Sequence, residues 1–167
     1  MNTELPNRKK LRLQNYDYSR NGCYFVTVCT HERQILFKET VGATLCGRPN
    51  EPGKMIEKWL LKLEKKFCGV EIPHYAVMPN HVHFIVAKTG DHAGSPLHEI
   101  VSWFKTMTTN DYIANVKFGK FSPFRQKLWQ RNYYEHIIRD DRDYYETAKY
   151  IENNLLKWEL DKYYCKD

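Results

Sequence analysis

The sequence predicts an α+β domain in which helices pack on an antiparallel sheet. Short segments are apolar or alternate between apolar and polar residues, and longer segments have helical spacing. Their predicted order is strand, helix, strand, strand, helix, helix, which suits this fold class. The chain has 167 residues, 42% of them hydrophobic, enough for one domain with a sizeable core. We expect residues 21–167 to form this domain and residues 1–20 to form a basic arm that leads into it.

The first half of the chain is expected to supply two strands and a helix. Residues 23–30 are rich in β-branched and aromatic types, which is typical of a buried strand. Residues 42–53 contain three glycines and two prolines and are expected to form a loop. Residues 54–67 have the spacing of an amphipathic helix, which Gly69 is expected to end. Residues 70–77 are expected to form the second strand.

The second half of the chain is expected to complete the sheet and add two helices. Residues 81–87 alternate between two faces, as a strand does. Residues 97–116 have the spacing of a second amphipathic helix, and residues 117–130 are irregular, basic and aromatic. Residues 129–138 are expected to contain a short strand or turn. A run of acidic residues then supplies an N-cap for a last helix over residues 142–156.

The composition limits the classes of function. Lysine and arginine total 26 against 20 aspartates and glutamates, a modest excess that permits a polyanionic partner. The chain is 14% aromatic, with 12 tyrosines, which suits single-stranded nucleic acid, although most rings are expected to lie in the core. Five cysteines without a CxxC pair argue against a thiolate zinc site and a disulfide framework. No stretch approaches the length of a membrane span, so we expect a cytoplasmic protein with reduced thiols.

Two histidines form a candidate metal site. His81 and His83 are two residues apart in a strand pattern, so both side chains point to one face, with β-carbons about 7 Å apart. Two imidazoles at that spacing can bind one metal ion. A bare His-x-His pattern is equally consistent with a structural pair. Apolar residues usually fill the core face of a strand, however, and two titratable rings in their place favour the metal site.

The last predicted helix carries a candidate nucleophile. Tyr150 and Asn154 are four residues apart and therefore share a helix face. A phenol with a pKa of about 10 is a weak nucleophile, and it needs a metal-polarised phosphate or a nearby base to attack. An amide oxygen four residues further on is a suitable third metal ligand. Spacing alone nevertheless favours Tyr150 as a core residue.

Four segments, taken in order, resemble one protein family. Residues 78–84 (MPNHVHF) resemble the HUH motif, His-hydrophobic-His, of the single-tyrosine transposases. Residues 15–27 resemble the first strand of that family and its lead-in, and residues 129–139 resemble the segment before its last helix. Residues 150–154 (YIENN) resemble the motif Tyr-Ile-x-x-Asn-Pro. The chain is thus similar to the insertion-sequence-200-like transposases, and most similar to their REP-associated tyrosine transposase branch.

The resemblance implies a fold, a site and a reaction. It implies a ferredoxin-like antiparallel sheet with both histidines on a central strand, and a C-terminal helix that carries the nucleophile, Tyr150. It implies that His81, His83 and Asn154 hold Mg²⁺ or Mn²⁺. Single-stranded DNA flanked by imperfect hairpins would be cleaved and rejoined through a 5′-phosphotyrosine. Leu155 stands where the family motif usually has proline, so the last helix is expected to run further.

Candidate DNA contacts lie outside that site. They are the basic residues of the arm and the basic and aromatic residues before the last helix: Arg8, Lys9, Lys10, Arg12, Trp129, Arg131, Tyr133, Tyr134 and Arg139. The basic side chains would contact phosphates and the aromatic rings would stack on bases. Some members of the family form dimers and others act as monomers, so the resemblance leaves a homodimer open.

Two other functions stay open at this point. A ferredoxin-like sheet also suits a nucleic-acid-binding module that has lost catalysis, although all four site residues are present here. A metal-dependent hydrolase would use water as its nucleophile. That function needs an acidic base near the histidines, and the sequence contains no HExxH motif or comparable carboxylate pair.

Overall fold

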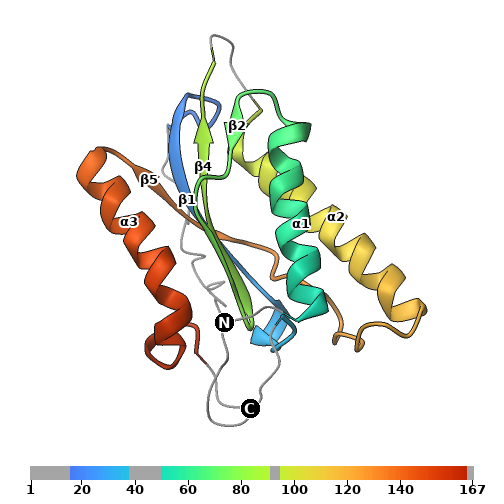
Figure 1. The fold of residues 1–167 in the computed structure, drawn as a ribbon. Coiled ribbons are helices and arrows are strands. Elements are labelled where there is room, and N and C mark those ends of the chain that lie inside the picture. Colours follow the sequence, from blue (N-terminus) through green and yellow to red (C-terminus); the bar gives the residue numbers. More distant parts are fainter. Residues whose placement is uncertain (1–15, 38–49, 91–94, 165–167) are drawn as a thin grey trace, which may run out of the picture.

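The structure, a computed structural model, describes residues 16–37, 50–90 and 95–164. Arg8, Lys9, Lys10 and Arg12 of the predicted basic arm lie outside these residues, as does most of the predicted 42–53 loop. The elements of Figure 1 are β1 (Gly22–Cys29), α1 (Glu51–Lys66), β2 (Val70–Glu71), β3 (Tyr75–Met78), β4 (His81–Lys88), α2 (Leu97–Lys117), β5 (Tyr134–Ile138) and α3 (Asp141–Asn154). Short 3-10 helices cover His31–Arg33 and Leu155–Leu160.

The strands form one antiparallel sheet with β4 and β1 at its centre. Its order is β2-β4-β1-β5, and β3 also pairs with β4, after β2 along the same edge. The pairing of β1 with β4 places Thr27 opposite His83 and Cys29 opposite His81. This order confirms the predicted α+β, ferredoxin-like fold with the histidines on a central strand.

Helices cover both faces of the sheet. Figure 1 shows α1 and α2 together on one side and α3 on the other. Strand alternation divides the core accordingly, because Val82, Phe84 and Val86 of β4 pack in the larger cluster with α1 and α2. Ile85 packs in the smaller cluster with Ile151 of α3. His81 and His83, which share the parity of Ile85, therefore point toward α3.

Three predicted boundaries are wrong. The predicted 70–77 strand is split into β2 and β3 around Pro73, which has no N–H to donate to a ladder. Helix α1 begins at Glu51, inside the predicted loop, because the Asn50 side chain accepts a hydrogen bond from Gly53 N and caps the helix. The predicted extension of the last helix past Leu155 takes the form of a 3-10 helix over Leu155–Leu160, since α3 ends at Asn154.

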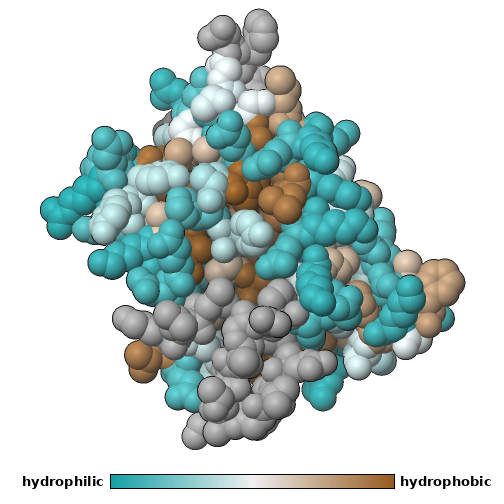
Figure 2. Space-filling model, in the orientation of Figure 1, coloured by the Kyte–Doolittle hydropathy of each residue, from teal (hydrophilic) through white to brown (hydrophobic). Residues whose placement is uncertain are grey.

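The outer surface of the described residues is mainly polar where helices form it. Hydrophilic side chains predominate over the outer sides of α1 and α3 in Figure 2. Among the helices of the described ranges, none is both long enough and apolar enough to span a membrane.

Candidate metal and tyrosine site

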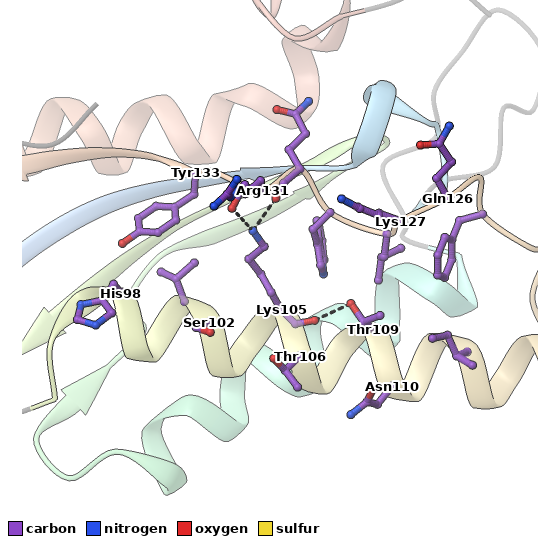
Figure 3. Close-up of a pocket in the computed structure, with 16 residues that line it drawn as sticks. His98, Ser102, Lys105, Thr106, Thr109, Asn110, Gln126, Lys127, Arg131 and Tyr133 are labelled. Atoms are coloured by element: carbon purple, nitrogen blue, oxygen red, sulfur yellow. Dashed lines mark hydrogen bonds between the residues drawn. The ribbon is translucent and has the colours of Figure 1, made fainter. Parts of the chain in front are cut away.

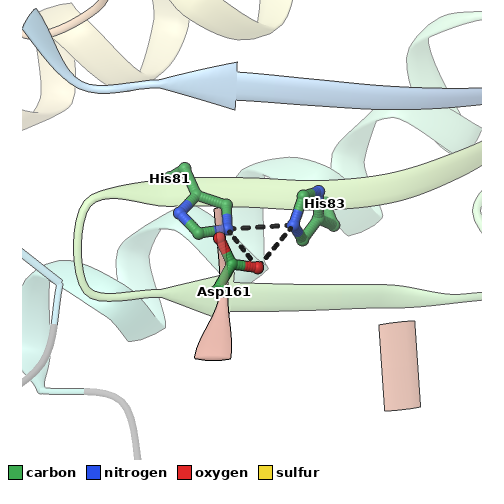
Figure 4. A group of neighbouring side chains, drawn as sticks. All are labelled: His81, His83 and Asp161. Atoms are coloured by element: carbon green, nitrogen blue, oxygen red, sulfur yellow. Dashed lines mark hydrogen bonds and ion pairs between the residues drawn. The ribbon is translucent and has the colours of Figure 1, made fainter. Parts of the chain in front are cut away.

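The two histidines of β4 face each other across a short gap. Both side chains are fully buried, and their Nε2 atoms lie 2.9 Å apart. Figure 4 shows the two rings pointing toward each other from β4. The strand predicts this arrangement, because residues two apart project from the same face. The ring of Tyr163, from the chain beyond α3, covers the pair with its centroid 4.8 Å from that of His81.

Hydrogen bonds to the outer ring nitrogens orient both imidazoles. Asn80 Nδ2 donates to Tyr163 O over 2.9 Å, which turns Asn80 Oδ1 toward His81 Nδ1 at 2.8 Å. His81 Nδ1 therefore carries the proton and leaves the Nε2 lone pair facing His83. On the other ring, His83 Nδ1 lies 2.8 Å from Thr27 Oγ1, a hydroxyl that can accept a hydrogen bond from the Nδ1–H group. Both Nε2 atoms are thus available as ligands, oriented in the manner typical of metal-binding histidines.

A carboxylate that sequence reasoning missed completes the group. Asp161 Oδ2 lies 3.9 Å from His81 Nε2 and 3.8 Å from His83 Nε2. The Asp161 side chain is fully buried, and its Oδ1 accepts a hydrogen bond from Tyr163 N over 2.6 Å. The segment after α3 folds back against β4 to bring it there. No motif surrounds this residue in the sequence, so only this return of the chain reveals it.

The predicted nucleophile lies next to this group. Tyr150 is half-exposed on α3, and its hydroxyl donates to Asp161 Oδ2 over 3.3 Å. Its ring packs against His83, with centroids 5.4 Å apart, and against Phe25. Burial, followed by the charge of Asp161, raises the pKa of Tyr150 to about 12. The phenol is therefore a poor nucleophile until some of that negative charge is offset.

Asn154 lies at the end of α3 and is buried. It lines a cavity of about 430 Å³ together with Tyr150, Asp161 and Lys162. Its Nδ2 atom has no hydrogen-bond partner among the described residues. An unsatisfied amide N–H at this place can donate to an acceptor such as a phosphate oxygen, whereas a metal ion would bind the amide oxygen. The structure thus places the predicted Asn154 beside Tyr150, while the carboxylate that faces the imidazoles is Asp161.

The protonation states suit a divalent cation. Burial, and for His81 also the neighbouring His83, lowers the pKa of both imidazoles, which keeps them neutral as ligands. Burial alone would raise the pKa of Asp161, but the two neighbouring imidazoles and the hydrogen bond from the Tyr163 amide hold this pKa well below its usual range. Two atoms can share one ion at the usual ligand distances only if they lie within about 4.2 to 4.6 Å of each other. The separations of 2.9, 3.8 and 3.9 Å meet this condition.

The predicted DNA contacts have different surroundings. Trp129 was expected to stack on bases, but it is buried in the core, and its Nε1 donates to Thr108 Oγ1 over 2.9 Å. Trp129 packs against Phe37 and Phe104 and is only 4% exposed, which leaves little of its ring for stacking on a base. The others remain accessible to a ligand: Arg131, Tyr134 and Arg139 are exposed, and Tyr133 is partly exposed.

Comparisons with known proteins agree with this fold. The family model described as "Transposase IS200 like" matches residues 19–154. An uncharacterized protein of Haemophilus influenzae is 31% identical over 98% of this chain and 96% of its own length. A second protein of that organism, described as "Putative REP-associated tyrosine transposase", is 24% identical over 87% of this chain and 77% of its own length.

Two solved structures share the fold. One is a REP-associated tyrosine transposase bound to a REP hairpin, with a TM-score of 0.59 and 20% identity over 90% of this chain and 76% of that chain. The other is a crystal structure of a transposase candidate from Deinococcus radiodurans, with a TM-score of 0.52 and 18% identity over 85% of this chain and 95% of that chain.

Proposed function

The chain belongs to the IS200-like transposase family, and from this we propose that it cleaves and rejoins single-stranded DNA through a covalent bond to Tyr150. One observation carries the proposal. The Tyr150 hydroxyl donates to Asp161 Oδ2 over 3.3 Å, and the same oxygen lies 3.8 Å from His83 Nε2. A candidate nucleophile is therefore in contact with a candidate metal-binding group.

His81, His83 and Asp161 are proposed to hold Mg²⁺ or Mn²⁺, with Asn154 as a further ligand at the rim. The bound ion would polarise the scissile phosphate and offset the charge of Asp161. Carboxylate, amide and imidazole are ligands that both of these ions accept when phosphate oxygens complete the shell. Asn80 and Thr27 orient the two imidazoles for this purpose.

The proposed reaction is a phosphoryl transfer to the phenol. The Tyr150 oxygen attacks the scissile phosphorus, so that a new O–P bond forms as the bond from phosphorus to the 3′ oxygen breaks. The phenol gives up its proton to solvent as this bond forms, and the departing oxygen takes up a proton to become a 3′-hydroxyl. A second 3′-hydroxyl then reverses the step and joins new ends. The phosphotyrosine retains the bond energy, so no nucleotide cofactor is required.

Single-stranded DNA that carries an imperfect hairpin is the proposed substrate. The structural relative bound to a REP hairpin supports this class of ligand. Exposed Arg131, Tyr134 and Arg139 are proposed to contact the DNA, as is Tyr133.

The test is a covalent adduct. Incubation with end-labelled hairpin DNA and Mn²⁺ should give a protein–DNA band on a denaturing gel, and Tyr150→Phe should abolish it. Tyr145→Phe, which changes an exposed tyrosine of the same helix, is the matched control and should leave the adduct intact. An adduct that persists in Tyr150→Phe would refute the assignment of Tyr150 as the nucleophile.

Asp161 also favours a second candidate, a phosphodiesterase that uses water. It supplies the carboxylate near the histidines that this function requires and that no sequence motif contains. Cleavage without any adduct on the same gel would favour the hydrolase. Binding without cleavage would leave a nucleic-acid-binding module.

A further inference from the structure

A groove separate from the tyrosine site lies between α2 and the irregular segment that leads to β5. Its volume is about 660 Å³. In Figure 3, side chains of α2 line one wall and the chain over residues 124–133 forms the other. Lys105 points from the helix toward the opposite wall.

The groove carries positive charge without acidic compensation. Lys105, Lys127 and Arg131 line it, and none of the described lining residues is an aspartate or glutamate. Lys105 is half-buried, and its Nζ donates to Gln130 O over 2.6 Å and to Arg131 O over 3.0 Å. Burial lowers its pKa to about 8, so the side chain remains largely protonated at neutral pH. A cation held among carbonyls rather than carboxylates leaves a net positive field in the groove.

The helical wall offers a regular row of polar groups. Ser102, Thr106 and Asn110 are exposed and lie four residues apart on one face of α2. A helix rises about 1.5 Å per residue, so these side chains recur roughly every 6 Å along the groove. Hydroxyl and amide groups at regular intervals suit a ligand with a repeating polar backbone. Tyr133 and the partly buried Phe124 add aromatic surface beside this row.

A smaller cavity lies between this groove and the ring that covers His81. Its volume is about 250 Å³, and it shares Gln130 and Tyr133 with the groove. Its lining also includes Tyr134 and Tyr163, and the Tyr163 ring packs on His81. The smaller cavity thus borders both the groove and the aromatic ring that covers the histidines.

We propose that this groove binds the sugar-phosphate backbone of the single DNA strand that continues from the scissile phosphate. The inference rests on the proposed function and extends it by assigning a path to the flanking strand. Lys127 and Arg131 contact phosphates, the polar row of α2 contacts the backbone, and Tyr133 and Tyr134 stack on bases along the path. Lys105 is a positioning residue, because it fixes the opposite wall through two backbone carbonyls.

The experiment measures binding apart from chemistry. Full-length Tyr150→Phe protein is titrated into fluorescent oligothymidylate in chelator, and anisotropy is followed at several salt concentrations. The double variant Lys127→Ala/Arg131→Ala should bind roughly tenfold more weakly. Each phosphate contact to single-stranded DNA contributes about 0.7 to the slope of log affinity against log salt, so the slope should fall by about 1.4. Duplex DNA of the same length should bind more weakly than the single strand.

The matched control is Lys65→Ala/Lys66→Ala, which removes the same charge from the exposed end of α1. Equal affinities and salt slopes for the two double variants would overturn the proposal. Benzoylphenylalanine at position 106 should crosslink to the strand, whereas the same group at position 66 should not, and crosslinking at 66 alone would also overturn it.

These outcomes are separate from those of the adduct assay. If wild-type protein forms no adduct while the groove variants weaken DNA binding as expected, the tyrosine chemistry alone is refuted. If wild-type protein forms the adduct but the groove variants bind DNA as well as their control does, the proposed role of the groove alone is refuted.

Discussion

At the scale of single residues, Asp161 connects the parts of the candidate site. Its Oδ2 atom faces both imidazoles and accepts a hydrogen bond from the Tyr150 hydroxyl, so one carboxylate oxygen lies beside the proposed metal ligands and the proposed nucleophile. Its position is itself fixed by the Tyr163 amide. A side chain with so many partners in a buried site is sensitive to small changes of charge.

Asp161→Asn keeps the shape of this side chain and removes its charge. We expect Mn²⁺ affinity, measured by calorimetry, to fall at least about tenfold, because a charged ligand becomes a neutral amide. Glu146→Gln, an exposed change on α3, should leave the affinity unchanged. Equal affinities in the two variants would show that Asp161 is not a ligand.

Thr27→Val tests the orientation of His83. The change removes the hydroxyl 2.8 Å from Nδ1 and leaves a buried ring N–H without a partner, which should cost about 1 to 3 kcal/mol in the free energy of unfolding. Metal affinity should fall by about 10- to 100-fold, as for other outer partners of histidine ligands. Thr27→Ser keeps a hydroxyl and should recover most of both losses in urea denaturation and calorimetry. A serine variant as impaired as valine would contradict this role.

At the scale of elements, the connection between α1 and β2 depends on close packing around one glycine. Gly69, between α1 and β2, has a φ of +72°, and a β-carbon there would lie 2.0 Å from Thr89 O. The connection therefore passes close to the end of β4, and it fixes where the edge of the sheet begins. Glycine is required here for two reasons, the left-handed backbone and the lack of space.

Gly69→Ala should destabilise the protein by more than about 2 kcal/mol, since the steric clash adds to the cost of about 1 to 2 kcal/mol for a left-handed residue. Gly119→Ala provides the control, because Gly119 has a φ of +68° but a β-carbon there would meet none of the described residues within 4 Å. Gly119→Ala should therefore lose only the stability that a left-handed residue costs, without the contribution of a steric clash. Urea denaturation of the two variants measures the difference, and equal losses would rule out the clash at Thr89.

The groove along α2 should respond to pH through Lys105. Its pKa of about 8 lies below that of an ordinary lysine, so it loses its charge between about pH 7 and pH 9. Affinity for single-stranded DNA at constant salt should fall across that range. Lys105→Arg keeps its charge and should show a smaller decline. The other titratable lining residues, His98, Lys127, Arg131 and Tyr133, are the same in both proteins, so equal declines would exclude Lys105 as the cause.

Metal binding should stabilise the molecule as a whole. The proposed ligands come from β4 at the centre of the sheet, from the end of α3 and from the segment beyond it. An ion that joins these parts binds only the folded chain, and at a hundred times its dissociation constant it adds about 2.7 kcal/mol to the free energy of unfolding. Calorimetry should show a rise in Tm with Mn²⁺ that is lost in the double variant His81→Ala/His83→Ala. A similar rise in that variant would place the ion elsewhere.

The sequence by itself determined what depends on local periodicity. Alternation in a strand places His81 and His83 on one face, and helical spacing places Tyr150 and Asn154 on another, because both repeats follow from backbone geometry. The family resemblance added the roles and the ferredoxin-like order of strands, which the sheet confirms.

Only the tertiary structure decided which distant residues meet. It brings Asp161 back from beyond α3 to the histidines, and it buries Trp129 between two phenylalanines instead of exposing it to DNA. It also places Lys105 opposite the segment that leads to β5. Contacts of this kind depend on how the chain returns on itself and on which side chains fill the core, and no local repeat encodes either.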